Sequence, residues 1–153
     1  MKNKKQTDVF GDSSISVPFV VPMITSDDKK SITNALNSRL LTDGPLLKKF
    51  ETEFAKFTGS KFAIGVSNAT SALQLSLLAS GIGKGDEVIV PDITFVATAN
   101  AVMATGATPI LADIEKNDLN ISVDSIKSNI TSKTKAIIPV HFAGKSCDMK
   151  KIV

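Results

Sequence analysis

The fold is decided within residues 62–101, which read FAIGVSNATSALQLSLLASGIGKGDEVIVPDITFVATANA. The beginning of this stretch, residues 62–66, is a short apolar run with β-branched members, which predicts a buried strand. Polar residues follow, and the pattern then changes to the good helix formers of residues 72–79, before Gly81 at the position of a C-terminal cap. The stretch therefore predicts a strand, a turn and a helix in succession.

The turn of residues 67–71, with the sequence SNATS, places hydroxyl groups at the start of this helix. The first turn of a helix has unpaired N–H groups and carries the positive end of the helix dipole, and the hydroxyls of Thr70 and Ser71 would point the same way. A phosphate group would bind well there. The alternative is that Ser67, Asn68 or Thr70 only caps the helix, which is the commoner role of such residues.

A second strand and a second helix follow directly. Residues 87–90 read EVIV and predict a buried strand, and residues 94–104 predict a helix rich in small side chains, with Phe95 at its start. Ligands of open parallel sheets bind beyond the carboxyl ends of the strands, so the turn of residues 67–71 and the turn before Phe95 are expected to face one crevice. Phe95 could cover a flat ring there, or it could be a core aromatic beside the sheet.

The rest of the chain continues the alternation of helices and strands. Thr25 and Asp28 form a plausible capping box for a helix that reaches about Leu40. Pro45 has the favoured first position of a helix that ends near Gly59. The remaining elements are two strands and a short helix, expected at 109–113, 135–140 and 123–130. This alternation predicts an α/β fold of three layers (α/β/α), in which helices cover both faces of a mainly parallel sheet.

The composition fits a cytoplasmic α/β domain. The 153 residues are 42% hydrophobic and 22% charged, which is enough for one sizeable core. The net charge of +3 comes without a basic stripe, so no nucleic-acid partner is expected. No stretch is long enough to span a membrane, and the amino terminus has no apolar signal core. One histidine and one cysteine give no metal-ligand cluster and no internal disulfide.

Five blocks of this sequence have a recognisable order and spacing: GPLLKKFETEFAKFTGSKFA, SNATSAL, GDEVIVPDITFVATANAV, GATPILADI and TSKTKAIIPVHFAGKSCDM. Together they resemble the amino-terminal part of the DegT/DnrJ/StrS nucleotide-sugar aminotransferases, which use pyridoxal phosphate. The resemblance covers nearly all of residues 17–153. It implies the aspartate-aminotransferase-like (type I) fold of pyridoxal-phosphate enzymes, here truncated.

The same resemblance implies a cofactor site. The cofactor phosphate would be held at Thr70 and Ser71, and the pyridine ring would stack on Phe95. Ala69 stands where many members of the family have glycine, so this residue is expected to keep a negative φ. The residues assigned to the cofactor are Asn68, Ala69, Thr70, Ser71 and Phe95.

A substrate site is implied as well. The resemblance places the loop of Leu41, Thr42, Asp43 and Gly44 near the sugar. His141, the only histidine, follows the strand of residues 135–140 and so lies at a carboxyl end that faces the same crevice. There its imidazole could contact the cofactor or the sugar, although it could equally be a hydrogen-bonded loop histidine.

Part of the family's catalytic machinery has no counterpart in this sequence. Members carry, beyond the matched region, an aspartate that pairs with the pyridine nitrogen and a lysine that forms the internal Schiff base. The lysines here lack that context; Lys48, Lys49 and Lys56, for example, lie on the solvated face of an amphipathic helix. We therefore expect a flexible tail at residues 1–16, an incomplete cofactor-binding large domain at 17–153, and no catalytic residue and no activity in this fragment alone.

The resemblance implies the activity of the complete protein. It would be a homodimer that moves an amino group, usually from glutamate, onto a keto carbon of a nucleotide-linked deoxysugar, for polysaccharide or modified-sugar biosynthesis. Two alternatives stay open: a family sugar dehydratase with histidine in place of the lysine, and a non-catalytic module that binds a phosphorylated ligand. A Rossmann dinucleotide-binding domain fits poorly, because SNATS lacks the glycines of G-x-G-x-x-G that let a backbone approach a pyrophosphate.

Overall fold

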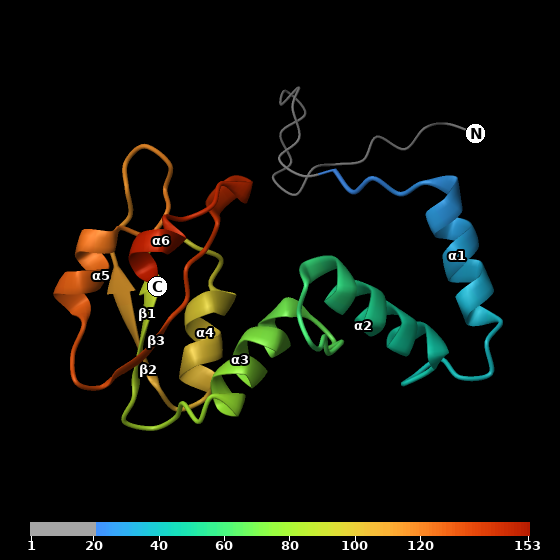
Figure 1. Ribbon diagram of the computed structural model, residues 1–153, viewed down its shortest axis with the longest axis horizontal. Helices are drawn as coiled ribbons and strands as arrows, with labels where there is room; N and C mark the ends of the chain where they lie inside the picture. The colour runs from blue at the N-terminus through green and yellow to red at the C-terminus, as the bar shows by residue number, and fades with distance from the viewer. Residues whose placement is uncertain (1–20) are drawn as a thin grey trace, which may run out of the picture. The chain divides into compact units, whose positions relative to one another are not determined.

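The computed structural model describes residues 21–153, so the predicted tail of residues 1–16 lies outside the described residues. The chain divides into two compact units, with the boundary between Ile64 and Gly65, and each unit is described by itself. The first unit contributes two helices, and the second contains a parallel sheet with its covering helices (Figure 1).

Helix α1, Ser26–Leu36, begins at the predicted capping box. The Asp28 N–H donates to the Thr25 hydroxyl at 3.2 Å, and the Thr25 N–H donates to the Asp28 carboxylate at 2.8 Å. The hydrogen bond from the Thr25 backbone lowers the pKa of Asp28. The helix ends at Leu36, with Asn37 as its C-terminal cap, and so falls short of the predicted end near Leu40.

Helix α2, Pro45–Thr58, has both of its predicted ends. Gly44 is the N-terminal cap, and a Cβ atom there would lie 2.7 Å from the Leu40 carbonyl oxygen, closer than any side chain could fit. Gly59 ends the helix with a left-handed φ of 71°, a conformation that glycine adopts at little cost. Local sequence signals thus set the length of this helix.

The strand predicted at residues 62–66 is wrong. This segment is not assigned to a strand, and no strand of the described sheet pairs with it. Phe62 and Ile64 are 74% and 81% exposed. A strand needs a neighbour for its N–H and C=O groups, and an apolar, β-branched pattern does not say whether that neighbour is present. The three described strands pair only with one another.

The second unit contains three strands, β1 (Glu87–Pro91), β2 (Thr108–Ala112) and β3 (Thr134–Ile137), in the order β2-β1-β3. Both pairings are parallel, as predicted. Ile89 at the centre of β1 is paired with Ile110 on one side and Ile137 on the other. Because alternate side chains of a strand point to opposite faces, β1 has to be apolar on both, and residues 88–91 are all buried.

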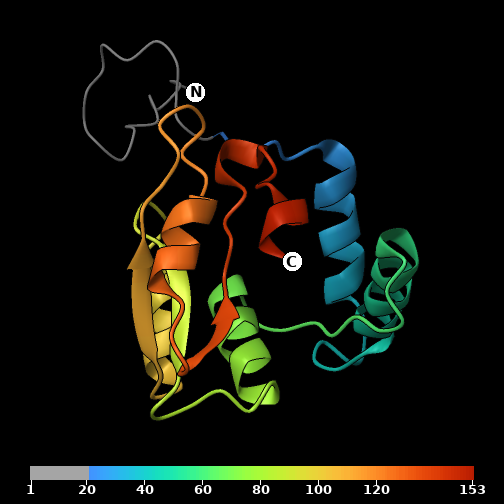
Figure 2. The ribbon, with the colours of Figure 1, turned by 60° about the vertical axis from the view of Figure 1, so that its left-hand side comes forward.

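Helices cover both faces of this sheet. On one face, Val88 and Val90 of β1 pack with Leu77 of α3 (Ala69–Ala79) and Val102 of α4 (Ala97–Ala104). On the other, Ile89 packs with residues that include Ile126 of α5 (Val123–Asn129), Cys147, and Met149 and Ile152 of α6 (Met149–Ile152). Figures 1 and 2 show α4 and α5 on opposite sides of the strands. The three-layer arrangement is therefore confirmed.

The order of the strands explains this division. The chain passes from β1 to β2 through α4, and from β2 to β3 through α5. Crossovers between parallel strands are right-handed. Because β2 and β3 lie on opposite sides of β1, the two crossovers run in opposite directions along the sheet. Right-handedness therefore places α4 and α5 on opposite faces.

Candidate functional site

The carboxyl ends of β1 and β3 lie side by side, and the chain leaves them over opposite faces of the sheet. Beyond the end of β3, the Ile138 N–H still donates to the Ile89 carbonyl of β1 at 2.9 Å. From β1 the chain turns to the face covered by α3 and α4, whereas from β3 it turns to the face that holds Cys147 and α6. Ligands of open α/β sheets bind where neighbouring strands diverge in this way.

The N-terminus of α3 lies toward the same edge of the sheet. The helix ends at Ala79 and a short turn leads from there into the start of β1, so α3 runs back from the carboxyl edge. Asn68 is its cap, because its side-chain oxygen accepts from the Ser71 N–H at 2.8 Å. The Ser67 and Ser71 hydroxyls lie 3.3 Å apart. The capping interpretation is thus correct for Asn68.

Within residues 21–153, capping by Asn68 leaves other donors at this helix end without hydrogen-bond partners. The N–H groups of Ala69 and Thr70 belong to the first turn, where a helix offers no acceptor. The Thr70 hydroxyl has no hydrogen-bond partner among residues 21–153, and Thr70 is exposed. Ala69 keeps a negative φ, as predicted. Two N–H groups and one hydroxyl therefore remain at the positive end of the helix.

Phe95 lies in the loop between β1 and α4. The helix begins at Ala97, later than the predicted start at residue 94. The loop is fixed by local hydrogen bonds: the Thr98 N–H donates to the Phe95 carbonyl at 3.0 Å, and the Thr94 and Thr98 hydroxyls lie 2.9 Å apart. The Phe95 side chain is 78% exposed and belongs to neither core cluster. Its ring is therefore available to a ligand.

His141 follows β3 in a loop that ends at Cys147, and it is exposed. Its Nδ1 accepts a hydrogen bond of 3.1 Å from the Cys147 N–H. The neutral ring therefore carries its proton on Nε2, on the side of the ring away from this contact. His141 is thus a hydrogen-bonded loop histidine that still has one nitrogen free to donate to a ligand.

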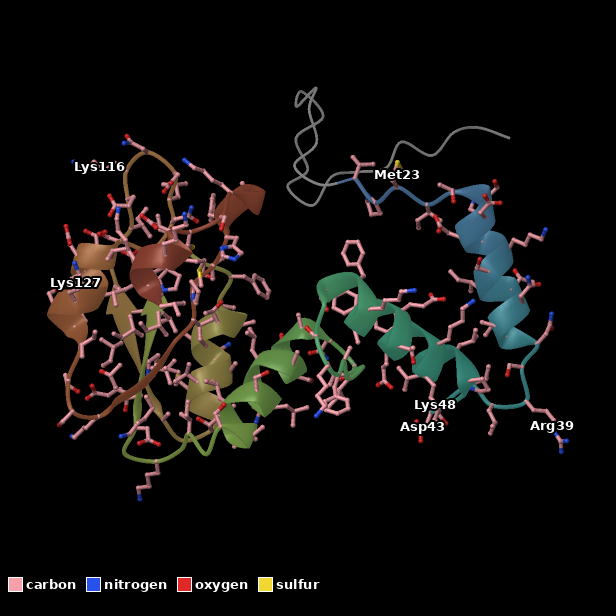
Figure 3. The ribbon with its side chains drawn as sticks, in the orientation of Figure 1. Met23, Arg39, Asp43, Lys48, Lys116 and Lys127 are labelled. Atoms are coloured by element: carbon pink, nitrogen blue, oxygen red, sulfur yellow. The ribbon has the colours of Figure 1, made fainter. Side chains whose placement is uncertain are left out.

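The loop of Leu41, Thr42, Asp43 and Gly44 belongs to the first unit. Asp43 has a left-handed φ of 48°, which short polar side chains tolerate, and leads into the Gly44 cap. Figure 3 shows Asp43 at the turn before α2, with Lys48 near the start of that helix. Residues 68–71, Phe95 and His141 therefore lie toward the carboxyl edge of the sheet in the second unit, whereas residues 41–44 belong to the first unit.

Sequence reasoning missed one residue of this edge. Asn120 has a side chain that is only 3% exposed, and it hydrogen-bonds to the loop that carries His141. Its partners lie more than twenty positions further along the chain, and no local pattern marks such a contact.

No helix within residues 21–153 has the length and apolar character needed to cross a membrane. In the same part of the chain, no group of three or more His, Cys, Asp and Glu side chains is arranged to hold a metal ion.

Comparison with known proteins identifies relatives. The model of the DegT/DnrJ/EryC1/StrS aminotransferase family matches residues 22–153. The spore coat polysaccharide biosynthesis protein SpsC of Bacillus subtilis is 47% identical over 137 residues, which make up 90% of this chain and 35% of SpsC. The chain thus spans about a third of the length of this relative.

Solved structures that resemble this chain include proteins related to the same family. NtdA from Bacillus subtilis, with its cofactor PMP bound, is 38% identical with a TM-score of 0.81, over 99% of this chain and 34% of NtdA. PseC from Helicobacter pylori, an aminotransferase of pseudoaminic acid biosynthesis, is 37% identical with a TM-score of 0.77, over 86% of this chain and 36% of PseC. At these identities the fold is that of the amino-terminal part of these enzymes.

Proposed function

Because the chain belongs to the DegT/DnrJ/EryC1/StrS aminotransferase family, we propose that the complete protein is a pyridoxal-phosphate-dependent sugar aminotransferase. It moves an amino group from glutamate onto a keto carbon of a nucleotide-linked deoxysugar. The similarity to SpsC, a protein of spore coat polysaccharide biosynthesis, supports a role in making a polysaccharide. The observation that carries the proposal is the pairing of unpartnered donors at the start of α3 with the exposed Phe95 ring at the same sheet edge.

The residues at this edge suit pyridoxal phosphate. A phosphate dianion would accept from the N–H groups of Ala69 and Thr70 and from the Thr70 hydroxyl, in the field of the helix dipole. Asn68 and Ser71 keep the turn in shape through their own hydrogen bond. Phe95 offers an exposed ring face on which a flat aromatic ring can stack, with centroids about 4.5–7 Å apart.

We assign His141 and the loop of residues 41–44 to the sugar substrate. When bound, pyridoxal phosphate would supply an electron-accepting ring and an aldehyde carbon that takes up the amino group. His141 would donate from Nε2 to an oxygen of the sugar. The loop of Leu41, Thr42, Asp43 and Gly44, in which the first three residues are exposed, would form hydrogen bonds with the sugar as well. We place the Schiff-base lysine and the aspartate that pairs with the ring nitrogen outside residues 1–153.

We propose further that the complete protein is a homodimer in the cytoplasm. The single cysteine, Cys147, is a free buried thiol, which fits a reducing compartment. An apolar stripe on α2 offers a surface for a second subunit, because Phe50, Phe54 and Phe57 are 56%, 48% and 87% exposed.

The test is a spectrum of the complete protein, expressed from the full open reading frame, with added pyridoxal phosphate. We expect a visible absorbance band from the lysine-bound cofactor, which glutamate bleaches. Thr70→Ala removes a charge-assisted hydrogen bond and should weaken cofactor binding by roughly 10–100-fold. Ser76→Ala is the matched control, because this hydroxyl bonds only to the Ala72 carbonyl of the same helix.

Other results would favour the alternatives. A bound cofactor that glutamate does not bleach, together with loss of water from a nucleotide-linked keto sugar, would indicate the dehydratase. Binding of inorganic phosphate at the start of α3 with no absorbance band would indicate a non-catalytic module. An unchanged affinity for the cofactor in Thr70→Ala would refute the assignment of the phosphate to this helix end.

A further inference from the structure

Asn120 is a buried polar residue whose side chain joins two segments distant in the sequence. It ends the turn of residues 115–120 and is 3% exposed. Its side-chain oxygen accepts from the Phe142 N–H at 3.0 Å. Its amide nitrogen donates to the carbonyls of Lys145 and Ser146, each at 3.3 Å. Both the oxygen and the nitrogen of the amide thus have hydrogen-bond partners, and these partners lie at both ends of the loop after His141.

That loop has an unusual backbone. Ala143 has φ 50° and Gly144 has φ 83°, so two successive residues are left-handed. Alanine rarely adopts this conformation, and such residues persist where the surrounding structure determines them. The loop's own bonds, from the Gly144 N–H to the His141 carbonyl and from the Lys145 N–H to the Phe142 carbonyl, make one short 3-10 turn (Phe142–Gly144). The Asn120 amide attaches that turn to the rest of the unit.

A second contact joins the same two segments. The Lys145 ammonium lies 3.0 Å from the Asp118 carboxylate. Asp118 in turn accepts from the Asn120 backbone N–H at 3.1 Å. The turn of residues 115–120 therefore holds the loop from the side through two neighbouring residues. Lys145 is 63% exposed at its side chain, so the buried Asn120 amide is the stronger of the two contacts.

The loop sets the direction of the His141 ring. The Cys147 N–H donates to His141 Nδ1 at 3.1 Å. The position of Cys147 is fixed in turn by its thiol, which contacts the Val140 carbonyl at 3.2 Å and the Asn120 side-chain oxygen at 3.5 Å. Asn120 thus contacts the residues just after His141 and the residue that binds its ring.

We infer that Asn120 is a positioning residue, which holds the loop of residues 141–147 and through it orients His141, with Nε2 directed to the substrate side of the carboxyl edge. Asn120 itself touches neither substrate nor cofactor in this arrangement; its effect passes through His141. The effect of Asn120 on turnover rests on the proposed function.

The experiment compares variants of the complete protein. Asn120→Ala removes all of the amide contacts, and Asn120→Asp keeps an oxygen for the Phe142 N–H but loses the donor to Lys145 and Ser146. Asn117→Ala, in the same turn and exposed, is the matched control. The ring of His141 is observed by nitrogen–proton NMR, and its signals are assigned by their loss in His141→Gln. Urea unfolding shows whether each variant folds.

The expected NMR result is independent of catalysis. The wild type and Asn117→Ala should show the tautomer with the proton on Nε2 and Nδ1 as acceptor. Both Asn120 variants should move the ring nitrogen shifts toward those of a free, exchanging imidazole. If Asn120→Ala does not fold, Asn120→Asp decides the matter. An unchanged tautomer in a folded Asn120 variant would overturn the inference.

Steady-state kinetics test whether the orientation matters. Asn120→Ala should lower kcat/KM by roughly tenfold in the wild-type background and by less than about twofold in the His141→Gln background, since residues that belong to one hydrogen-bond network couple. An equal loss in both backgrounds would mean that Asn120 only stabilises the fold, and would overturn the positioning role. If no variant binds pyridoxal phosphate, the proposed function fails, whereas the NMR result still decides the positioning of His141.

Discussion

The two units of this chain form their helices in different ways. In the first unit, neither α1 nor α2 contains a buried residue, and their ends coincide with capping groups. In the second unit, β1 is buried on both faces, and α3 and α4 have weak amphipathic patterns with partners on the sheet. Helix boundaries can thus be specified by local signals, whereas the sheet depends on packing between distant segments.

The largest effect is expected from truncating an isoleucine, and it is compared between a buried and an exposed position. Ile89→Ala removes a fully buried side chain between β2 and β3 and should lower the free energy of unfolding by roughly 2–5 kcal/mol. Ile64→Ala, at a side chain that is 81% exposed, should cost less than about 0.5 kcal/mol. Urea unfolding of both variants measures the difference. Equal losses would contradict the comparison, because they would mean that Ile64 is also packed.

A smaller effect is expected at the end of α2. Gly59→Ala places a Cβ on a residue with φ 71° and should destabilise the helix by about 1–2 kcal/mol. Gly83→Ala is the control, because Gly83 does not have a left-handed φ and the nearest atom to an added Cβ would lie at 3.6 Å. Thermal unfolding followed by circular dichroism compares them. If Gly59→Ala is neutral, the cap does not set the end of this helix.

The capping box of α1 should contribute somewhat less. Thr25→Ala removes the acceptor of the Asp28 N–H and should cost about 1 kcal/mol of local helix stability. Amide hydrogen exchange should become faster in the first turn of α1 and stay unchanged in β1. Thr33→Ala, whose hydroxyl bonds only to the Lys29 carbonyl in the helix interior, serves as the control. Faster exchange in β1 as well would show that the two units unfold together.

The smallest expected effect is a pH dependence in the loop of the second unit. The side chain of Lys145 lowers the pKa of Asp118 from its ordinary value of 3.8. A lowered pKa in the folded state means that Asp118 stabilises the loop above pH 3.8, and that this contribution is lost as the pH falls through the folded value. Amide exchange of residues 142–147 should therefore speed up on acidification beyond the intrinsic trend. Asp118→Asn should remove the excess; Asp124→Asn, at an exposed pair with Lys127 on α5 (Figure 3), should not.

The features that were predicted from the sequence are those that depend on short-range interactions. The start of α1 at Thr25 and both ends of α2 at Pro45 and Gly59 were predicted correctly, because caps act within four residues. The strand at Ile89 was predicted because burial on both faces makes a continuous apolar run. The strand at Ile110 was predicted from its apolar run as well, although Ile110 is only partly buried.

Features that depend on distant partners were not predicted. Residues 62–66 have the composition of a strand, yet strand formation requires a neighbour that composition does not specify. Asn120 acts through Phe142 and Lys145, and an isolated asparagine has no pattern that indicates such contacts. At the candidate site, the donors at Thr70 were anticipated from the helix start, but the exposure of Phe95 became known only from the structure.

The central position of β1 has a consequence for synthesis on the ribosome. Glu87 pairs with Thr108 and with Thr134, which lie roughly 20 and 50 residues further along the chain. At about 5–20 residues per second, β3 emerges roughly one to five seconds after β2. During that interval one edge of β1 has apolar faces and unpaired backbone groups, the features of an aggregation-prone edge. The nascent chain is therefore most exposed to wrong partners just before the His141 loop is made.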